Sequence, residues 1–526
     1  MVPRPLTPGP TEALLPTFYA GRDIFITGGT GFMGKVLLER LLSTCPEVGR
    51  IHLLMRDKKG QPPNKRLVQL KQSQVFDNVR ANNPRQLEKL VVVCGDVSQP
   101  QLGLDNEAIT ALREVSVVFH SAATLKFDEP LPVAVEHNVR SVERIMEVCD
   151  KLPNIQAFVH VSTAYSNADL SVVEERVYPP ARPLRQVYAL VDSLPEELLA
   201  TITPQFISPK PNTYTFTKSL AENVVQEHGN RGYPVAIFRP TVVVSSLRHP
   251  FPGWIENLNG PSGMVVAAGK GLLHVFAVRS AARTDLLPVD IAIDTLMAVA
   301  WEIAIDKPEQ VRVYNCSTCE NPTTWSDFKS SVRKHLHKNP LDKAFWYPCG
   351  FCVENKVALK TLEMILQTIP LHMAEYISKI IGIKSKLSLI KVNQRLKSMN
   401  EVLRFFSTRE WYFQTDNVRH LKERLSPQDS AIYNLDPHSI VWNELMENFV
   451  KGARKYLLQE KDQDIQDAKK HLQKMFYVHY GMILSVMTLT FRFLLQNEFI
   501  KTFIWRTFKS LLSQFNITYS KITEIS

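Results

Sequence analysis

Seven short runs of β-branched and aliphatic residues lie between Arg22 and about Asn315, with helical stretches between them. The runs read DIFITG, RIHLLMR, LVVVCGD, SVVFHSAA, AFVHVSTAY, VAIFRPTVVV and RVYNCS. A parallel strand is covered on both faces, so its sequence is continuously apolar rather than alternating. The pattern therefore predicts a doubly wound α/β fold with one parallel sheet. Apolar spacings of three and four residues predict helices at Lys35–Cys45, Leu131–Leu152 and Tyr214–Glu227.

A glycine-rich turn follows the first run. The segment TGGTGFMG contains G-x-G-x-x-G, beginning at Gly29, and also T-G-x-x-G-x-x-G, beginning at Thr27. Both patterns predict a dinucleotide site, because glycines at a strand-to-helix turn let the backbone approach a pyrophosphate, which then meets the helix N-terminus. We expect this site to be formed by Thr27, Gly28, Thr30, Gly31, Phe32, Met33 and Gly34.

The end of the second run indicates which dinucleotide binds. A site for NAD places an acidic residue there to hold the ribose hydroxyls. In IHLLMRDKKG, Arg56 holds this place and Lys58 follows two residues later. A cation at this point pairs with a 2′-phosphate, and an arginine can do so bidentately. We therefore predict NADPH as the cofactor, with Asp57 keeping NAD open as the alternative.

Two further strand ends supply residues that we expect at the cofactor. Asp96 and Val97 follow the third run, where the Asp96 carboxylate can accept a hydrogen bond from the adenine amino group. Small residues follow the fourth run and leave room for a cofactor to approach the strand end. These small residues are Ser121, Ala122 and Ala123.

Tyr214 and Lys218 lie four residues apart in NTYTFTKSLAE and share one face of a helix. An ammonium beside a phenol lowers the pKa of the phenol, so Tyr214 can exchange a proton with a carbonyl oxygen near neutral pH. The fifth run ends in Ser162 and Thr163, and a hydroxyl there can bind the same oxygen; we prefer Thr163. Asn138 either holds a water or backbone group behind Lys218 or is an ordinary helix residue.

The chain divides into five segments by composition. Residues 1–20 are a proline-rich tail without a long apolar run, so we expect no signal peptide. Residues 21–320 form the nucleotide-binding domain, 321–355 a loop-like linker, and 356–460 a small helical domain. Residues 461–526 form a C-terminal segment with an uncharged helix at about 475–495 and a basic amphipathic tail, for which we predict membrane attachment. Whether this helix spans the membrane or lies in its interface stays open.

The charge and the cysteines narrow the choice of partners. The net charge is +10, which suits an anionic membrane surface or a phosphate-rich substrate; without a nucleic-acid-binding motif we expect no nucleic acid partner. Two C-x-x-C pairs, Cys316/Cys319 and Cys349/Cys352, have a spacing similar to that of a four-thiolate zinc site. We favour ordinary free thiols and predict no metal. None of the cysteines lies in the motifs that carry Thr163 and Tyr214, so none is placed to form an acyl-enzyme.

Taken together, TGxxGxxG, the strand-end Ser/Thr and YxxxK resemble the extended short-chain dehydrogenase/reductase superfamily, with its Rossmann fold. The resemblance favours the glycine pattern that begins with Gly28 over the one that begins with Gly29. The segments HSAATLKFDE, VHVSTAYSN and PFPGWIENLNGPSG are moreover similar to those of alcohol-forming fatty acyl-CoA reductases. That resemblance covers nearly the whole chain, because this family carries a C-terminal helical "male sterility" domain and often a membrane segment. The C-x-x-C pairs depart from its pattern.

The resemblance implies a reaction that spacing alone does not. Two NADPH would reduce a long-chain fatty acyl-CoA through a hemithioacetal and an aldehyde to a primary alcohol, with release of CoA. Tyr214 would donate the proton, Thr163 would assist, and Lys218 would tune Tyr214 and hold the nicotinamide ribose. The partners implied are the acyl-CoA and membrane lipid, with a homo-oligomer left open. The family suggests the endoplasmic reticulum, with the catalytic domain facing the cytosol, and the peroxisomal membrane as the alternative.

Two other functions fit the same residues. One is a membrane-associated NADP-dependent sterol or sugar-nucleotide dehydrogenase of the same superfamily. The other is a catalytically silent NADP-sensing scaffold, against which the intact Tyr214 and Lys218 argue.

Overall fold

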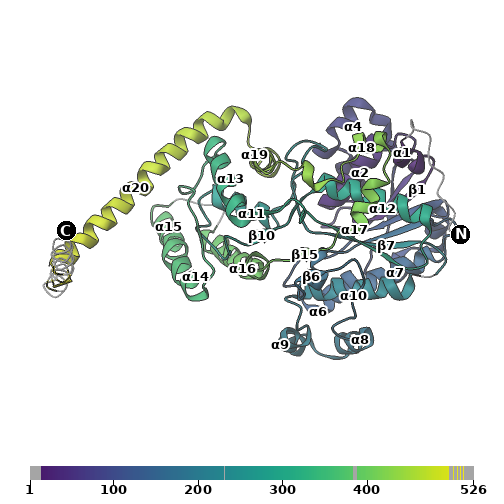
Figure 1. The fold of residues 1–526 in the computed structure, drawn as a ribbon, viewed down its shortest axis with the longest axis horizontal. Coiled ribbons are helices and arrows are strands. Elements are labelled where there is room, and N and C mark those ends of the chain that lie inside the picture. The colour runs from purple at the N-terminus through teal and green to yellow at the C-terminus, as the bar shows by residue number, and fades with distance from the viewer. Residues whose placement is uncertain are drawn as a thin grey trace, which may run out of the picture.

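A parallel sheet of seven strands forms the centre of the N-terminal part of the computed structural model (Figure 1). The structure describes residues 13–229, 231–382 and 388–496, and beyond these residues 502, 506, 507, 510 and 513. The strand order is β12-β7-β5-β4-β1-β2-β3, and every neighbouring pair is parallel. All seven predicted strands are confirmed: β1 (Asp23–Thr27), β2 (Ile51–Met55), β3 (Leu90–Cys94), β4 (Val115–His120), β5 (Ala157–Val161), β7 (Val235–Pro240) and β12 (Arg312–Cys316).

Side chains on the strands alternate between two apolar layers, as a sheet covered on both faces requires. Ile24 and Ile26 of β1 belong to the layer with α2 (Phe32–Thr44) and α12 (Val289–Asp306). Phe25, between them, belongs to the opposite layer with α7 (Ser141–Cys149) and α10 (Thr213–His228). The three predicted helices are thereby confirmed, the second as α6 (Leu131–Val135), the π-helical turn η4 (Glu136–Arg140) and α7.

The sheet order changes direction between β1 and β4, because β2 and β3 extend from one side of β1 while β4, β5, β7 and β12 extend from the other. Ligands of open parallel sheets bind in the crevice outside the carboxyl ends of the strands at such a point. The glycine turn follows β1 and the run of small residues follows β4, so both predicted cofactor segments lie there.

Short elements complete the N-terminal part. A helical pair, α8 (Leu184–Ser193) and α9 (Glu196–Phe206), projects away from the sheet below α10 (Figure 1). The remaining elements are α3 (Pro63–Lys71), η1 (Gln74–Phe76), α4 (Asp77–Asn82), η2 (Pro84–Lys89), η3 (Pro100–Gly103), α5 (Asn106–Ala111), η5 (Ala164–Asn167), β6 (Val172–Val173), β8 (Val242–Val244), α11 (Pro261–Gly269), β9 (Val275–Phe276), β10 (Arg283–Thr284) and β11 (Leu286–Pro288).

The predicted N-terminal tail and linker both contain structure. Within the tail, α1 (Leu14–Tyr19) packs on the sheet domain, and the buried Tyr19 hydroxyl donates a hydrogen bond to Met297 O at 2.8 Å; residues 1–12 lie outside the described residues. Within the linker, β13 (Thr323–Thr324) leads into α13 (Trp325–Lys338), whose N-terminus has a capping box formed by Thr324 and Asp327. The prediction of a loop from 321 to 355 is therefore wrong for its first half.

The C-terminal part is helical, as predicted, and it is joined to the sheet domain. Asn315, at the end of β12, donates hydrogen bonds from its side chain to Val173 O of β6 and to Gln414 O, which follows β15 (Tyr412–Phe413). β15 pairs with β6 in a short parallel bridge. The elements are β14 (Phe351–Cys352), α14 (Lys356–Glu363), η6 (Met364–Thr368), α15 (Ile369–Ile380), α16 (Leu389–Ser407), α17 (Asp416–Glu423), α18 (Pro427–Ile432), η7 (Pro437–Ser439), α19 (Trp442–Gly452) and η8 (Ala453–Leu457).

A last helix, α20 (Ile465–Gln496), follows the short turn η9 (Asp462–Asp464) and extends away from the rest of the protein (Figure 1). Its beginning is held by His471, which contacts Ala344 O, and by Trp346, whose indole N–H donates to His479. Among the helices that the structure describes, none is both long and apolar enough to cross a membrane. Of the two arrangements left open for the predicted helix at about 475–495, the spanning one is therefore not supported. Most of the basic amphipathic tail lies outside the described residues.

Candidate active site

The turn after β1 has the geometry of a pyrophosphate cradle. Gly28 has φ +77°, and a Cβ there would lie 2.7 Å from Ala122 N, so only glycine fits. A Cβ on Gly34 would collide with Gly28 O. Gly31 caps the N-terminus of α2, and a Cβ there would meet only Gly28 O, at 3.2 Å. These contacts favour the pattern that begins with Gly28 and leave the N-terminus of α2 open to an anion.

The small residues after β4 hold this turn in place. Ser121 N donates to Thr27 O and Ala122 N donates to Thr27 Oγ1, both at 3.2 Å. Thr27 Oγ1 also lies 2.7 Å from His120 Nδ1. Ala123 is half-buried beside them, as are Thr30, Phe32 and Met33 on the other side of the turn. The structure thus brings the residues predicted at the phosphate turn together at the switch point of the sheet.

Two arginines meet at the far end of the cofactor crevice. Arg56, directly after β2, has an exposed side chain whose Nη1 lies 3.2 Å from Asp96 Oδ2. Arg66 of α3 donates from Nη1 to Arg56 O at 2.6 Å and from Nη2 to Thr30 Oγ1 at 3.4 Å. Burial and the nearby charge of Arg56 lower the pKa of Arg66. The two guanidinium groups, with the carboxylates of Asp96 and Asp57 near them, are the groups at this end of the crevice that could pair with a 2′-phosphate.

The other predicted residues of this crevice have protein partners. Asp96 Oδ1 accepts a hydrogen bond from Ser98 N at 3.0 Å. Burial raises the pKa of Asp96, but the hydrogen bonds from Ser98 and the proximity of Arg56 outweigh it, so the net shift is downward. Val97 O accepts from Arg144 at 3.2 Å, and the backbone of Lys58 pairs with that of Gln61. Their contacts with a cofactor stay predictions.

The predicted catalytic residues come from β5 and α10, which lie side by side. Asn212 caps α10 by accepting a hydrogen bond from Thr215 N at 2.9 Å, and this places Tyr214 in the first helical turn. Thr163 follows the end of β5, and its hydroxyl is hydrogen-bonded with that of Tyr214. Lys218, one turn further along α10, donates to Val161 O at 2.8 Å. The predicted triad is therefore assembled.

The pKa of Tyr214 differs from the sequence-based expectation. Burial raises it to about 12, and the hydrogen bond with Thr163 opposes this shift. Lys218 is not among the groups that shift it, because the ammonium is directed at the Val161 carbonyl; the prediction that Lys218 lowers the pKa of Tyr214 is wrong for this structure. Burial lowers the pKa of Lys218 itself to about 8, with Glu222 opposing. Tyr214 thus holds its proton at neutral pH.

Ser162 has a different environment from Thr163. Its hydroxyl donates to Glu222 Oε1 at 2.5 Å, inside the protein. Glu222 is in turn bound by Arg239 through Nε at 2.9 Å and Nη2 at 2.7 Å, and both side chains are almost completely buried. Because Ser162 serves this buried network, the geometry favours Thr163 as the hydroxyl that acts with Tyr214.

Asn138 lies in the π-helical turn η4 and is buried. Its Oδ1 accepts from Thr124 N at 2.9 Å, and its Nδ2 donates to Thr217 Oγ1 at 3.0 Å. Asn138 therefore holds the backbone of Thr124, in the loop after β4, and the side chain of Thr217, which directly precedes Lys218. Of the two expectations, the structure supports the first, since Asn138 holds the backbone of Thr124.

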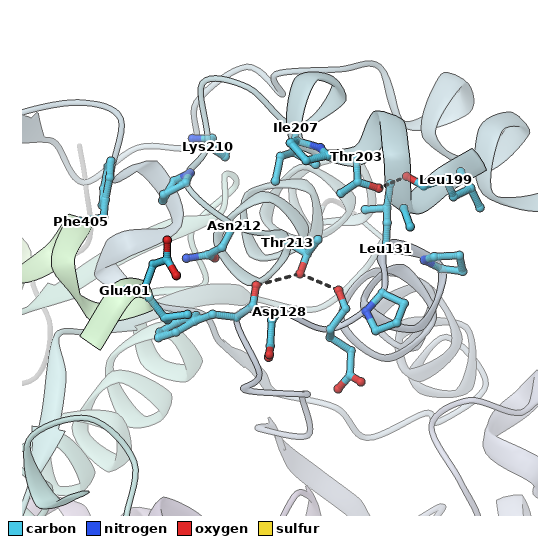
Figure 2. A pocket seen from close by; sticks show the side chains of 18 of the residues that line it. Asp128, Leu131, Leu199, Thr203, Ile207, Lys210, Asn212, Thr213, Glu401 and Phe405 are labelled. Carbon is cyan, nitrogen blue, oxygen red and sulfur yellow. Dashed lines mark hydrogen bonds between the residues drawn. The ribbon is translucent and has the colours of Figure 1, made fainter. Parts of the chain in front are cut away.

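A cavity of about 610 Å³ opens beside Tyr214. It lies between the loop 127–132, α9, the start of α10 and α16 of the helical part (Figure 2). The ring of Phe127 makes a T-shaped contact with Tyr214, at 5.4 Å between centroids, and stacks on Phe406 of α16 at 5.5 Å. The sequence did not indicate this cavity, because its walls come from segments up to two hundred and seventy-eight residues apart, from Phe127 to Phe405.

The cysteines show no common site. Cys316 Sγ contacts Thr295 Oγ1, and Cys319 Sγ contacts Phe413 O. Cys349 Sγ lies 3.4 Å from His274 Nδ1. All seven are free thiols, and no group of three or more His, Cys, Asp or Glu side chains that could hold a metal exists among the described residues.

Comparison with known proteins decides the family. Two models described as "Male sterility protein" match residues 26–296 and 366–460. Fatty acyl-CoA reductase 1 of Gallus gallus is 36% identical over 503 residues, which cover 95% of this chain and 97% of the relative. The chain belongs to the fatty acyl-CoA reductases. Fatty acyl-CoA reductase 2 of Bos taurus is similar as well, at 34% identity over 94% of this chain and 96% of the relative.

Solved structures support the fold of this reductase. The reductase domain of a nonribosomal peptide synthetase from Mycobacterium tuberculosis aligns with a TM-score of 0.54 at 17% identity, covering 86% of this chain and 94% of that domain. The terminal R domain of the myxalamid PKS-NRPS pathway aligns with a TM-score of 0.53 at 18% identity, covering 82% of this chain and 90% of that domain. At these identities the likeness shows the fold alone, a Rossmann-like reductase domain with a further C-terminal part.

Proposed function

We propose that this protein reduces long-chain fatty acyl-CoA to a primary alcohol with NADPH and releases CoA. One observation carries the proposal: in a chain of the fatty acyl-CoA reductase family, Tyr214 interacts with Thr163 and is in contact with Phe127, which lines a mainly apolar cavity. A thioester carbonyl at Tyr214 would thus have a reductant on one side and room for an acyl chain nearby.

The residues present fit NADPH. The N-terminus of α2 with Gly28, Gly31 and Gly34 would hold the pyrophosphate, and Arg56 with Arg66 would hold the 2′-phosphate. Lys218 would hold the nicotinamide ribose, as the resemblance to the family implies. NADPH bound here supplies one hydride per reduction step.

Tyr214 acts as the proton donor. Its raised pKa keeps the phenol protonated at neutral pH, which suits the reductive direction, where a carbonyl oxygen gains a proton. The thioester carbonyl carbon gains a hydride and its oxygen a proton, giving a hemithioacetal. The C–S bond then breaks, the hydroxyl proton passes to the sulfur, and the products are the CoA thiol, which leaves, and an aldehyde. A second hydride and proton convert the aldehyde to the alcohol. Thr163 stabilises the developing oxyanion by hydrogen bonding.

Activity measurements separate this proposal from the two alternatives. The purified protein should oxidise NADPH in the presence of a long-chain acyl-CoA, and gas chromatography should find the matching alcohol. If no acyl-CoA in a series of chain lengths supports NADPH oxidation, the proposal fails and a sterol or sugar-nucleotide dehydrogenase becomes the better reading. Equal activity of Tyr214→Phe and the parent would remove the mechanism, whereas a silent scaffold predicts no turnover by either.

We also propose that α20 binds a membrane by lying in its interface. The membrane would be that of the endoplasmic reticulum or, alternatively, of the peroxisome, and the catalytic part would face the cytosol. Large apolar side chains on several faces of α20 are exposed, among them Tyr477, Leu484, Met487, Leu489 and Phe491. An insoluble alcohol product suits a membrane-bound enzyme. Flotation with anionic vesicles tests the proposal, and extraction by alkaline carbonate would indicate interfacial rather than spanning attachment. A homo-oligomer stays a prediction.

A further inference from the structure

The cavity beside Tyr214 has an apolar interior. Leu131, Leu199 and Ile207 line it and are almost completely buried, and Phe405 of α16 lies across the cavity from Leu199 (Figure 2). Val402 of α16 also belongs to the lining. Its volume lies within the range of about 300–1,000 Å³ that is typical of ligand sites. The interior therefore suits an aliphatic chain.

The charges around the cavity decide which half of an acyl-CoA can enter. Four acidic residues line it: Asp128, Glu129, Glu196 and Glu401. The one lysine in the lining, Lys210, is already neutralised, since its ammonium lies 2.6 Å from Asp169 and donates to Asn167 at 2.9 Å. Phosphate groups would meet repulsion here, because like charges in contact cost free energy. The phosphates of CoA are thereby disfavoured and an uncharged occupant is favoured.

The position of the cavity connects it to the reacting carbonyl. Asn212 and Thr213 line it, and they directly precede Tyr214. Thr213 Oγ1 lies within hydrogen-bond distance of Phe127 O at 3.2 Å and of Glu129 O at 2.9 Å, which fixes the loop 127–132 against the start of α10 (Figure 2). The ring of Phe127 lies between Tyr214 and Phe406. A chain that fills the cavity thus reaches Phe127, whose ring contacts the catalytic phenol.

We propose that this cavity holds the fatty acyl chain of the substrate, with the CoA portion outside it, and that α16 of the helical C-terminal part limits the chain length. The inference rests on the proposed function and deepens it. It gives the helical part a role in selecting the substrate: α16 provides the wall opposite α9. Each methylene of the chain that enters should tighten binding about fourfold, equivalent to about 0.8 kcal/mol.

The test is a chain-length profile of kcat/KM with decanoyl-, dodecanoyl-, palmitoyl- and stearoyl-CoA. Ala200→Trp narrows the cavity from α9, and because Ala200 is exposed to the cavity, the fold should tolerate the change. Leu198→Trp is the matched control, since Leu198 is exposed on the same helix but does not line the cavity. We expect Ala200→Trp to lower kcat/KM for palmitoyl- and stearoyl-CoA at least tenfold and for decanoyl-CoA less than threefold, and Leu198→Trp to leave the profile unchanged.

Val402→Trp tests the wall from α16 and should shift the profile toward shorter chains in the same way. An unchanged profile in both cavity variants would overturn the proposal, and an unchanged profile in Val402→Trp alone would overturn the role of α16. A uniform loss for all chain lengths would instead place CoA in the cavity. Glu401→Gln further separates an acyl chain in the cavity from CoA in the cavity. Removing this negative charge should lower KM for every acyl-CoA only if the CoA phosphates lie beside residue 401.

Failure of the proposed function itself has a different signature. In that case the parent protein binds NADPH, measured by its fluorescence, but shows no turnover with any of the four acyl-CoAs. If the parent is active and the thermal unfolding curves of the variants match that of the parent, the chain-length profile alone decides the fate of the acyl-chain proposal.

Discussion

Ser162 and Thr163 are neighbours in the chain, yet their hydroxyl groups serve different parts of the protein. Ser162 donates to the buried Glu222 at 2.5 Å, and Thr163 is hydrogen-bonded with Tyr214. Ser162, the first residue after β5, thus supports the interior, and Thr163 faces the reaction. This separation predicts opposite consequences for two otherwise similar substitutions.

Thr163→Ala should lower kcat about 10²- to 10³-fold, because it removes a hydrogen-bond donor at the developing oxyanion. Ser162→Ala should retain kcat within a few fold but lower stability by about 1.5–3 kcal/mol, since it removes a hydrogen bond to a buried carboxylate. Steady-state kinetics and denaturant unfolding of both variants check this prediction. The reverse pattern, with activity lost in Ser162→Ala and kept in Thr163→Ala, would exchange their roles.

The pKa values of Tyr214 and Lys218 predict a decrease of activity at alkaline pH. Tyr214, with a pKa of about 12, stays a proton donor throughout the working range. Lys218, with a pKa of about 8, is cationic below that pH and loses its charge as the pH rises through it. If the charge is required, kcat/KM should fall above about pH 8. A pH profile that stays flat up to about pH 10 would contradict the role of the charge.

Lys218→Arg is the control for this profile. A guanidinium remains charged throughout the range, so the alkaline decrease should disappear even where the absolute rate is lower. If kcat/KM decreases at alkaline pH in the parent but not in Lys218→Arg, the decrease is due to deprotonation of Lys218.

The strands and the glycine turn could be predicted from the sequence because the rules that determine them are local. A strand buried on both faces is continuously apolar, and Gly28 is required where φ is positive and Ala122 lies close. The helix α13 also had a local signal: Thr324 and Asp327 form a capping box, and Phe328, Val332 and Leu336 repeat at helical spacing. That helix was missed although its sequence indicates it.

Other features depend on contacts between distant segments, which one sequence does not reveal. Arg66 lies ten residues beyond Arg56 on a separate helix, and only the fold brings its guanidinium to Thr30. The pKa of Tyr214 is set by burial, so the spacing to Lys218 predicted the wrong direction. The cavity likewise exists only because α16 packs opposite α9.

Arg66 offers a test of the cofactor assignment. Arg66→Ala should raise KM for NADPH about 10- to 100-fold, because one or two charge-assisted hydrogen bonds to the 2′-phosphate are lost. KM for NADH, which lacks this phosphate, should not change. Lys65→Ala is the matched control, since it removes a neighbouring exposed cation from the same helix. Equal effects on NADPH and NADH would show that Arg66 supports the fold rather than binding the phosphate.

Glu222 and Arg239 form a bidentate ion pair that is almost completely buried. Arg140 and Asp192 form an ion pair near the surface, in which Nη2 alone contacts both carboxylate oxygens, at 2.7 and 2.6 Å. Glu222→Gln should therefore cost about 3–5 kcal/mol, because it leaves the buried guanidinium without its counter-charge. Asp192→Asn should cost less than about 1 kcal/mol, since water screens the exposed pair. Denaturant unfolding at constant ionic strength measures both. Equal costs would mean that burial does not set the strength of these pairs, and that the network beneath Ser162 contributes no more to stability than a surface contact.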